Sequence, residues 1–183
     1  YYDTNIGTHN VVYTDIENTD NYDHIYQSDL CGWVGQLGYN KDSIYGANVY
    51  TAEENETLKA ASFYATGKDS QYELYVVRQF EDETSLEKMI PVASGKLGNA
   101  GYYTVDFNQG IEVDAGERYA VVLHIITPGS VHPMAIEYAA DEATENVDLD
   151  DGESYISANG SKWVSVDTVE KSNLCIKAFS DNR

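Results

Sequence analysis

Two alternating runs in the middle of the chain constrain its fold most. In residues 102–107 (YYTVDF) and 119–127 (YAVVLHIIT), large apolar side chains recur at every second position. Successive side chains of a β-strand point to opposite faces of the sheet, so a period of two indicates strands. The second run is apolar on both faces, which is typical of a central strand covered on both sides. The segments NQG and DAGE, between the two runs, are expected to be turns.

Similar runs, separated by turn residues roughly every ten positions, extend along the chain. Helical periodicity of any length is absent, although residues 81–88 are expected to form one helical turn, and Pro91 to lie at a strand edge or bulge. The pattern predicts an all-β fold, an antiparallel β-sandwich or jelly roll, in one domain spanning residues 1–183. The further strands are expected at residues 10–14, 31–34, 48–52, 58–66, 71–80, 89–97, 132–138, 154–157, 162–166 and 174–180.

The charge balance excludes some partners. Thirty-one acidic residues against eleven basic ones give a net charge of -20, which repels phosphate backbones and anionic membrane surfaces. Nucleic acid is therefore not an expected partner. No apolar run approaches the roughly 20 residues of a membrane span, so membrane insertion is not expected either. The chain begins without Met, and we interpret it as a piece of a longer protein.

Two acidic loops suggest calcium. Hard cations such as Ca²⁺ prefer several oxygen ligands, which loops rich in Asp and Asn can supply. Residues 15–24 (DIENTDNYDH) and 147–154 (VDLDDGES) have this composition, but neither has the spacing of an EF-hand. A solvated acidic surface is therefore the alternative. We predict one structural Ca²⁺, with ligands drawn from Asp20, Asp23, Asp148 and Asp150.

Aromatic residues suggest a carbohydrate ligand. β-Sandwiches that bind sugars use flat rings against the apolar faces of the sugar, while a few polar groups fix its orientation. Most of the sixteen tyrosines are expected to pack in strands, where Tyr is favoured. Trp163 follows the turn signal Asn159–Gly160, and Trp33 lies among glycines in CGWVG. We therefore predict Trp163, Trp33 and Asn159 as ligand-binding residues, with a packing role as the alternative for each ring.

Catalytic signatures are lacking in the sequence. None of the four histidines lies in a nucleophile motif, and His124, inside an apolar strand, is expected to be a hydrogen-bonded core residue. A pair of catalytic carboxylates cannot be selected from thirty-one acids, so an enzyme is not predicted. Cys31 and Cys175 both have apolar neighbours and are interpreted as buried free thiols, with a disulfide between them as the alternative.

Long stretches of the chain resemble one known family. THNVVYTDIENTDNYDHIYQSDLCGWVGQLGY resembles the segment that follows the peptidase domain in secreted, papain-type cysteine peptidases of Gram-positive anaerobes. YGANVYTAEENETLKAASFYATGKDSQYELYVV is similar to the first paired strands of the lectin-like domain in those proteins, and SYISANGSKWVSV and NLCIKAF to its end. The resemblance implies a β-sandwich similar to carbohydrate-binding modules, sometimes with bound calcium.

The resemblance also implies a function and a location. The chain would be a noncatalytic module that binds carbohydrate or a cell-wall polymer beside a peptidase domain, in an extracellular protein attached to the cell surface. A structural spacer that orients the peptidase and binds no sugar is the alternative. The segment CGWVG is superficially similar to the catalytic motif of the peptidases but lacks its second Cys, so Cys31 is not expected to be a nucleophile.

Overall fold

The computed structural model describes residues 11–14, 16, 18–150 and 152–183. The described residues form β-strands and two short 3-10 helices, and they contain no α-helix. The elements are β1 (His24–Tyr26), β2 (Gly35–Leu37), β3 (Ser43–Thr51), β4 (Glu56–Ala65), β5 (Ser70–Val77), η1 (Glu83–Glu87), β6 (Ile90–Leu97), β7 (Gly101–Val113), β8 (Arg118–Ile126), β9 (Met134–Glu137), β10 (Glu153–Ser157), β11 (Val164–Ser165), η2 (Val166–Thr168), β12 (Asn173–Leu174) and β13 (Ile176–Asn182).

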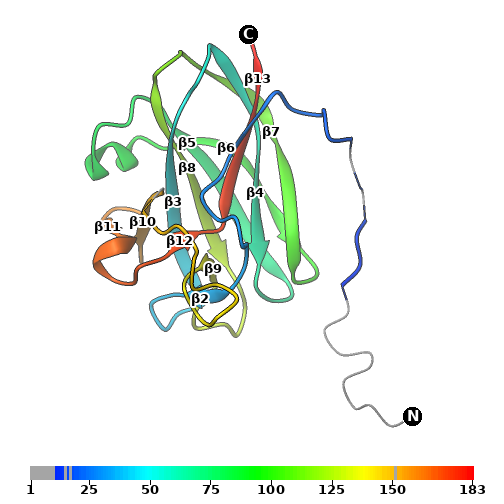
Figure 1. Cartoon of the computed structure of the whole chain (residues 1–183), viewed down its shortest axis with the longest axis vertical. Helices are drawn as coiled ribbons and strands as arrows, with labels where there is room; N and C mark the ends of the chain where they lie inside the picture. Colours follow the sequence, from blue (N-terminus) through cyan, green and yellow to red (C-terminus); the bar gives the residue numbers. More distant parts are fainter. Residues whose placement is uncertain (1–10, 15, 17, 151) are drawn as a thin grey trace.

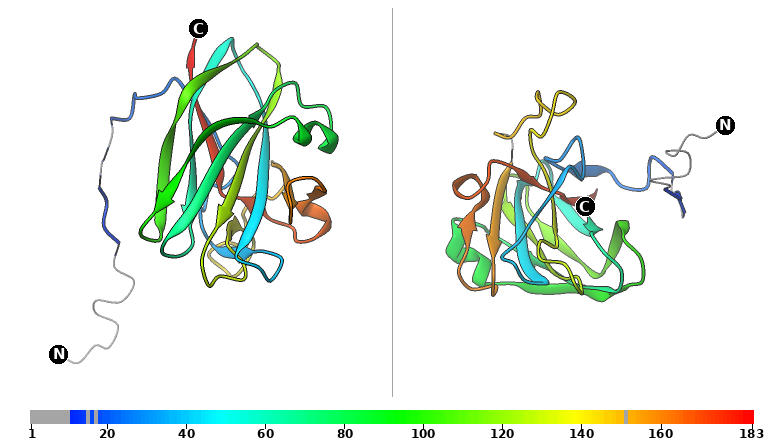
Figure 2. Two further views of the ribbon diagram at one scale, coloured as in Figure 1. Left: turned by 180° about the vertical axis from the view of Figure 1, so that it is seen from behind. Right: turned by 90° about the horizontal axis from the view of Figure 1, so that it is seen from below.

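Two antiparallel sheets form the body of the molecule (Figure 1). One has four strands in the order β1-β13-β4-β7, and the other has six in the order β11-β10-β3-β8-β5-β6. The view from below in Figure 2 shows the sheets as separate layers. A small sheet, β12-β9-β2, lies at the end of the sandwich that is lowest in Figure 1. This arrangement confirms the predicted all-β antiparallel sandwich.

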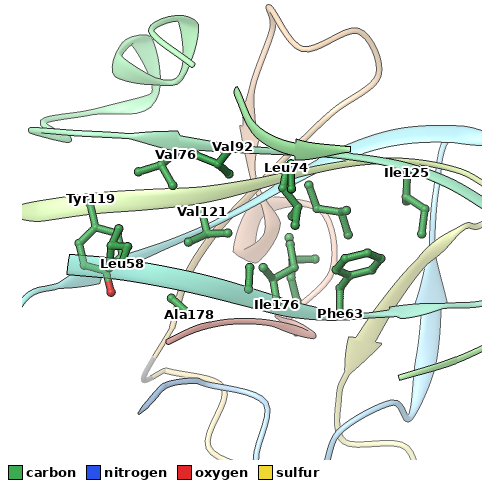
Figure 3. Close-up of a cluster of buried hydrophobic side chains, with 14 of the residues drawn as sticks. Leu58, Phe63, Leu74, Val76, Val92, Tyr119, Val121, Ile125, Ile176 and Ala178 are labelled. Atoms are coloured by element: carbon green, nitrogen blue, oxygen red, sulfur yellow. The ribbon is translucent and has the colours of Figure 1, made fainter. Parts of the chain in front are cut away.

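The main hydrophobic core lies between the two large sheets (Figure 3). Alternation places one side of each strand inward, so that Phe63 of β4, Leu74 of β5 and Ile176 of β13 are wholly buried. Figure 3 shows these side chains between the ribbons, with Tyr119 near one end of the cluster. Burial of apolar area at about 25 cal/mol per Å² is the main force that holds the sheets together.

The Tyr119→Phe variant is expected to be more stable than the parent protein. The Tyr119 ring packs between Tyr26 and Tyr50, but its hydroxyl is buried and lacks a hydrogen-bond partner among the described residues. An unpaired buried hydroxyl costs roughly 1–3 kcal/mol, and phenylalanine keeps the ring while removing that cost. Urea unfolding should show a higher free energy of unfolding, whereas a lower value would show that the hydroxyl is satisfied.

Several predicted strands are confirmed, and so is the prediction that Pro91 lies at a strand edge or bulge. Strand β6 lies at the edge of the six-stranded sheet, where a residue without a backbone N–H removes no ladder hydrogen bond. Leu74 pairs with Ala93 and Tyr75 with Pro91, so β6 carries one extra residue and forms a bulge there. The expected helical turn is η1, whose N-terminus is capped by the Asp82 carboxylate.

Three predictions about the strands are wrong. Asn10 lies outside the described residues, and residues 11–14 and 31–34 form no strand. Instead, the strands in this part of the chain are β1, which pairs with β13, and β2, which pairs with β9. Each short strand adds to an edge of its partner that would otherwise leave backbone groups unpaired. The expected NQG turn lies inside β7, which runs without a turn to Val113. Residues 107–110 oppose Lys59 alone, so the turn-like residues form a bulge.

Candidate functional site

A row of polar and aromatic residues crosses the outer face of the six-stranded sheet. Register pairs Ser157 of β10 with Tyr45 of β3, Tyr45 with His124 of β8, His124 with Glu73 of β5, and Glu73 with Ser94 of β6. Adjacent strands are about 4.8 Å apart, so five strands give a row about 19 Å long. Ser157 itself is wholly buried. We call the surface formed by the other residues of the row and their neighbours the His124 face, and define it as Ser43, Tyr45, Glu73, Tyr75, Ser94, His124 and Trp163.

The imidazole of His124 is held from three sides. Its Nδ1 lies 2.7 Å from Glu73 Oε2, and its Nε2 lies 2.9 Å from Ser43 Oγ. The ring of Tyr45 stacks on it, with centroids 3.9 Å apart and an angle of 2° between the planes. The hydrogen-bonded state predicted for His124 is therefore confirmed, but its expected place in the core is wrong. Leu123 and Ile125 point into the core, so alternation turns His124 to the outer face.

Hydrogen bonds within the row determine the protonation states of Glu73 and Tyr75. The hydrogen bond from His124 lowers the pKa of Glu73 below its ordinary value, and a second bond from the Tyr75 hydroxyl, 3.0 Å away, acts in the same direction. Burial and the hydrogen bond to Glu73 raise the pKa of Tyr75 to about 12. Glu73 is therefore an ionised acceptor at neutral pH, while Tyr75 keeps its proton, so the row offers both acceptors and donors.

A hollow lies at the β6 end of this row. Its volume is about 420 Å³, and it is lined by His124 and Glu73 together with the exposed side chains of Gln71, Ser94 and Lys96. Further along the same face, η1 and Phe80 pack over the sheet, where Leu86 and Phe80 join a second apolar cluster. The uncovered part of the face therefore combines flat rings at one end with a polar hollow at the other.

Trp163 and Asn159, two of the predicted ligand-binding residues, lie at the other end of the row. The Trp163 ring meets Tyr45 edge-on, with centroids 6.3 Å apart. Its Nε1 is buried without a hydrogen-bond partner among the described residues. The Asn159 side-chain oxygen accepts hydrogen bonds from the backbone N–H groups of Ser161 and Lys162, so it holds the turn that precedes Trp163. Their roles toward a ligand stay predictions.

Trp33, the third predicted ligand-binding residue, lies on the opposite side of the sandwich. Its ring packs at 5.7 Å from that of Tyr64 in β4, and Tyr64 lies 5.0 Å from Tyr102 in β7. Trp33 is 37% exposed and Tyr102 is 44% exposed. We call these three residues the Trp33 group. Because β4 and β7 belong to the four-stranded sheet, Trp33 and Trp163 lie on opposite sides of the sandwich and cannot contact one small ligand together.

Three of the four predicted calcium ligands have other contacts in the structure. Asp23 Oδ2 accepts a hydrogen bond from the backbone of Asn182, and Asp148 Oδ1 accepts one from the backbone of Asp150. Asp150 also pairs with Lys171 at 2.9 Å, while Asp20 is exposed in a turn. Within the described part of the chain, no three His, Cys, Asp or Glu side chains gather in a way that could hold a metal. Residues 15, 17 and 151 of the two loops lie outside the described residues.

Calcium therefore stays a proposal, and thermal unfolding tests it. A bound Ca²⁺ stabilises the native state by mass action, so 1 mM CaCl₂, on the order of a hundred to ten thousand times the Kd of a typical sensor site, would raise the melting temperature above that in EDTA. The Asp148→Asn and Asp150→Asn variants should lose this shift. A melting temperature that is the same in both buffers would reject a structural Ca²⁺.

The two cysteines are free thiols, and only one of them is buried. Cys175 is enclosed, as predicted, and burial raises the pKa of its thiol well above the ordinary value. Cys31 is exposed, so its predicted burial is wrong. It lies in a turn that leads to Trp33, and its backbone N–H donates a hydrogen bond to the buried carboxylate of Glu137. The turn is thus held by its backbone, and the thiol is left at the surface.

Comparison with known proteins identifies the sandwich. A family model described as a lectin-like domain matches residues 25–180, which include nearly all the strands. The chain belongs to the lectin-like domain family. The lectin-like domain is a noncatalytic module. A search of curated proteins finds no match to it. The family match confirms the resemblance seen in the sequence.

Solved structures share the fold of this lectin-like domain. One is a clostridial cysteine protease, Cwp84, in a form after propeptide cleavage, with a TM-score of 0.72 and 24% identity over 87% of this chain and 40% of that chain. Another contains the cysteine protease and lectin-like domains of Cwp84, a surface layer associated protein of Clostridium difficile, with a TM-score of 0.68 and 21% identity over 87% of this chain and 36% of that chain. The lectin-like domain thus spans well under half of either matched chain.

Proposed function

We propose that this lectin-like domain binds carbohydrate or a cell-wall polymer through the His124 face. The observation that carries the proposal is the row from Tyr45 to Ser94, in which polar side chains are held in place beside flat rings. Sugar sites need this combination, because rings contribute contact area while fixed polar groups select the orientation of hydroxyls. His124 cannot rotate freely between Glu73 and Ser43, so little side-chain entropy would be lost on binding.

The charge of the chain narrows the class of carbohydrate. A net charge of -20 repels polyanions over a distance of about 10 Å at moderate salt. Lys96, the only Lys or Arg that lines the hollow, lies 3.7 Å from the carboxylate of Asp69, which neutralises it in part. The proposed ligand is therefore a neutral glycan or one that carries amino groups, and we do not expect a polymer of uronic acid or phosphate to bind.

The proposal also covers the location of the parent protein and the domain that adjoins this module. The matched Cwp84 chains contain a cysteine protease domain, and one of them is described as surface layer associated. No helix in the described part of the chain is long and apolar enough to cross a membrane. We propose that the domain belongs to an extracellular protein at the cell surface, beside a cysteine peptidase domain. It would hold that peptidase near its polymer and raise its effective concentration there.

A second candidate function is that of a structural spacer, and the Trp33 group favours it. Exposed rings clustered on the outer face of the four-stranded sheet are suited to contact with a neighbouring protein domain. In that case the domain would orient the peptidase and bind no sugar. The two functions use opposite faces of the sandwich, so they can be separated by experiment.

A panel of oligosaccharides in a thermal-unfolding assay tests the carbohydrate proposal. A ligand at about 100 times its Kd adds roughly 2.7 kcal/mol to the free energy of unfolding and raises the melting temperature. Neutral and amino-sugar oligomers are expected to include at least one that produces a shift, while polygalacturonate produces none. If no member of a broad panel shifts the melting temperature, the spacer function replaces the binding function.

A further inference from the structure

A buried carboxyl group on the outer face of the four-stranded sheet lacks hydrogen bonds to its oxygens among the described residues. Asp29 is wholly buried, yet neither of its carboxyl oxygens has a hydrogen-bond partner among the described residues. Buried polar groups are almost always paired, because an unpaired one costs free energy that a folded protein can rarely spare. The state of this side chain therefore calls for an explanation in the chemistry around it.

Lys177 of β13 faces this carboxyl group. Its Nζ lies 3.4 Å from Asp29 Oδ2 and 3.4 Å from the Asp29 backbone oxygen, and it donates a hydrogen bond to Gln27 Oε1 at 2.6 Å. The Lys177 side chain is only 13% exposed. Both partners are fixed by the fold, since β13 pairs along its length with β4 and the Asp29 turn is tied to Gly32 through its backbone. The amine and the carboxyl group are thus held close together.

The surroundings disfavour a pair of ions at this position. Two buried charges lose their hydration, and the attraction between them repays this loss only when the remaining hydrogen bonds are made. Burial raises the pKa of Asp29, and the charge of Glu137 raises it further, while Lys177 acts in the opposite direction. The carboxylate of Glu137 is itself wholly buried and accepts a hydrogen bond from Asn173 Nδ2 at 2.9 Å. Transfer of one proton from the amine to Asp29 would give a neutral pair.

We propose that Lys177 and Asp29 become joined by an intramolecular amide bond between Nζ and Cγ. The free amine of Lys177 attacks the carbon of the protonated Asp29 carboxyl group, the new C–N bond forms, and the C–OH bond breaks. The hydroxyl leaves with a proton from the amine as one molecule of water. The condensation needs no oxidant, reductant or cofactor. The product is an uncharged amide, so neither Asp29 nor Lys177 is left as a buried ion.

The bond would link the turn before β2 to the last strand of the sandwich. The two residues are 148 positions apart in the sequence, so the bond would close most of the lectin-like domain into a covalent ring. A link across so long a loop restricts the unfolded chain far more than the folded one, as a disulfide does. This proposal is independent of carbohydrate binding, because Asp29 and Lys177 do not belong to the His124 face.

Mass spectrometry of the denatured protein tests the bond directly. The intact mass is expected to be lower than that of the sequence by one water molecule. After trypsin digestion, residues 1–41 and 172–183 should appear as one joined species that lacks cleavage after Lys177, because an acylated lysine is not a trypsin site. A full intact mass, or a loss of water that maps to other peptides, would overturn the proposal.

Variants separate this bond from an ordinary ion pair. The Lys177→Met and Asp29→Ala variants should each recover the full mass expected from their sequences, and both separate peptides should then be found. Lys59 and Asp181 form a matched pair on the same sheet at 3.8 Å, but both side chains are exposed. The Lys59→Met variant should therefore keep the loss of one water. If a variant does not fold, the digest of the parent protein still decides the question.

Discussion

The Glu56→Ala variant is expected to lose about 3 kcal/mol or more of its free energy of unfolding. Glu56 is wholly buried at the start of β4, and its carboxylate accepts hydrogen bonds from the Tyr26 hydroxyl at 2.6 Å, from the backbone of Glu53 and Glu54 at 3.0 and 2.9 Å, and from the Ser180 hydroxyl. Hydrogen bonds to a charged group contribute about 1.5–3 kcal/mol each, and alanine would leave several donors unpaired. Urea unfolding at pH 7 measures the loss.

The same residue makes stability depend on pH. Burial alone would raise the pKa of Glu56, but the hydrogen bonds from Ser180, Tyr26 and the backbone outweigh it and lower the pKa below the ordinary value. Its contribution is therefore fully present above about pH 4.3, the pKa of an unfolded glutamate, and is lost as the pH falls through the lower folded value. The parent protein should lose stability in that window more steeply than Glu56→Ala. A matched control is Glu54→Ala, since Glu54 is exposed, and it should unfold like the parent.

The Tyr45→Ala variant is expected to bind the oligosaccharide identified in the panel at least about 30-fold more weakly than the parent protein. Central aromatic residues at binding sites typically contribute about 2 kcal/mol or more, which corresponds to that factor. Alanine removes a flat ring from the middle of the row and also frees the His124 imidazole, on which that ring stacks. Isothermal titration calorimetry measures the change.

Two control variants make this prediction specific to the face. Tyr45→Phe keeps the ring and should bind within a few-fold of the parent, while Trp33→Ala changes the opposite side of the sandwich and should leave the affinity unchanged. If Trp33→Ala abolishes binding and Tyr45→Ala does not, the sugar site belongs to the Trp33 group. Each variant's melting temperature must be compared first, because Tyr45 also packs against the second apolar cluster.

The fold could be predicted from the sequence because alternation is a local signal. The pattern in residues 119–127 predicts a strand covered on both sides, and β8 does lie in the interior of the six-stranded sheet. Pro91 indicated an edge or bulge for the same local reason. The local pattern wrongly predicted a turn at NQG, where β7 continues as a strand. Whether residues 107–110 form a turn or a bulge depends on pairing with β4, which a local pattern does not contain.

The site could be predicted only in part, since it depends on which strands pair. Tyr45, Glu73 and His124 lie on three different segments, and the sheet order β3-β8-β5 brings them together. Alternation in SIYGANVY and QYELYVV could have placed Tyr45 and Glu73 on one side of their own strands, but register decides which side chains meet. The prediction for Trp163 rests on a local turn signal, whereas the separation of Trp33 from it reflects long-range topology that no local pattern contains.

The most direct test of the central claim is to map the bound sugar on the protein by NMR. Backbone amide shifts of the isotope-labelled domain would be followed while the oligosaccharide that gives the largest thermal shift is added. We expect the perturbed residues to cluster on β3, β5, β6 and β8 around Tyr45, Glu73 and His124, and at Trp163. Saturable shifts confined to β4 and β7 around the Trp33 group, or no shifts at all, would contradict binding through the His124 face.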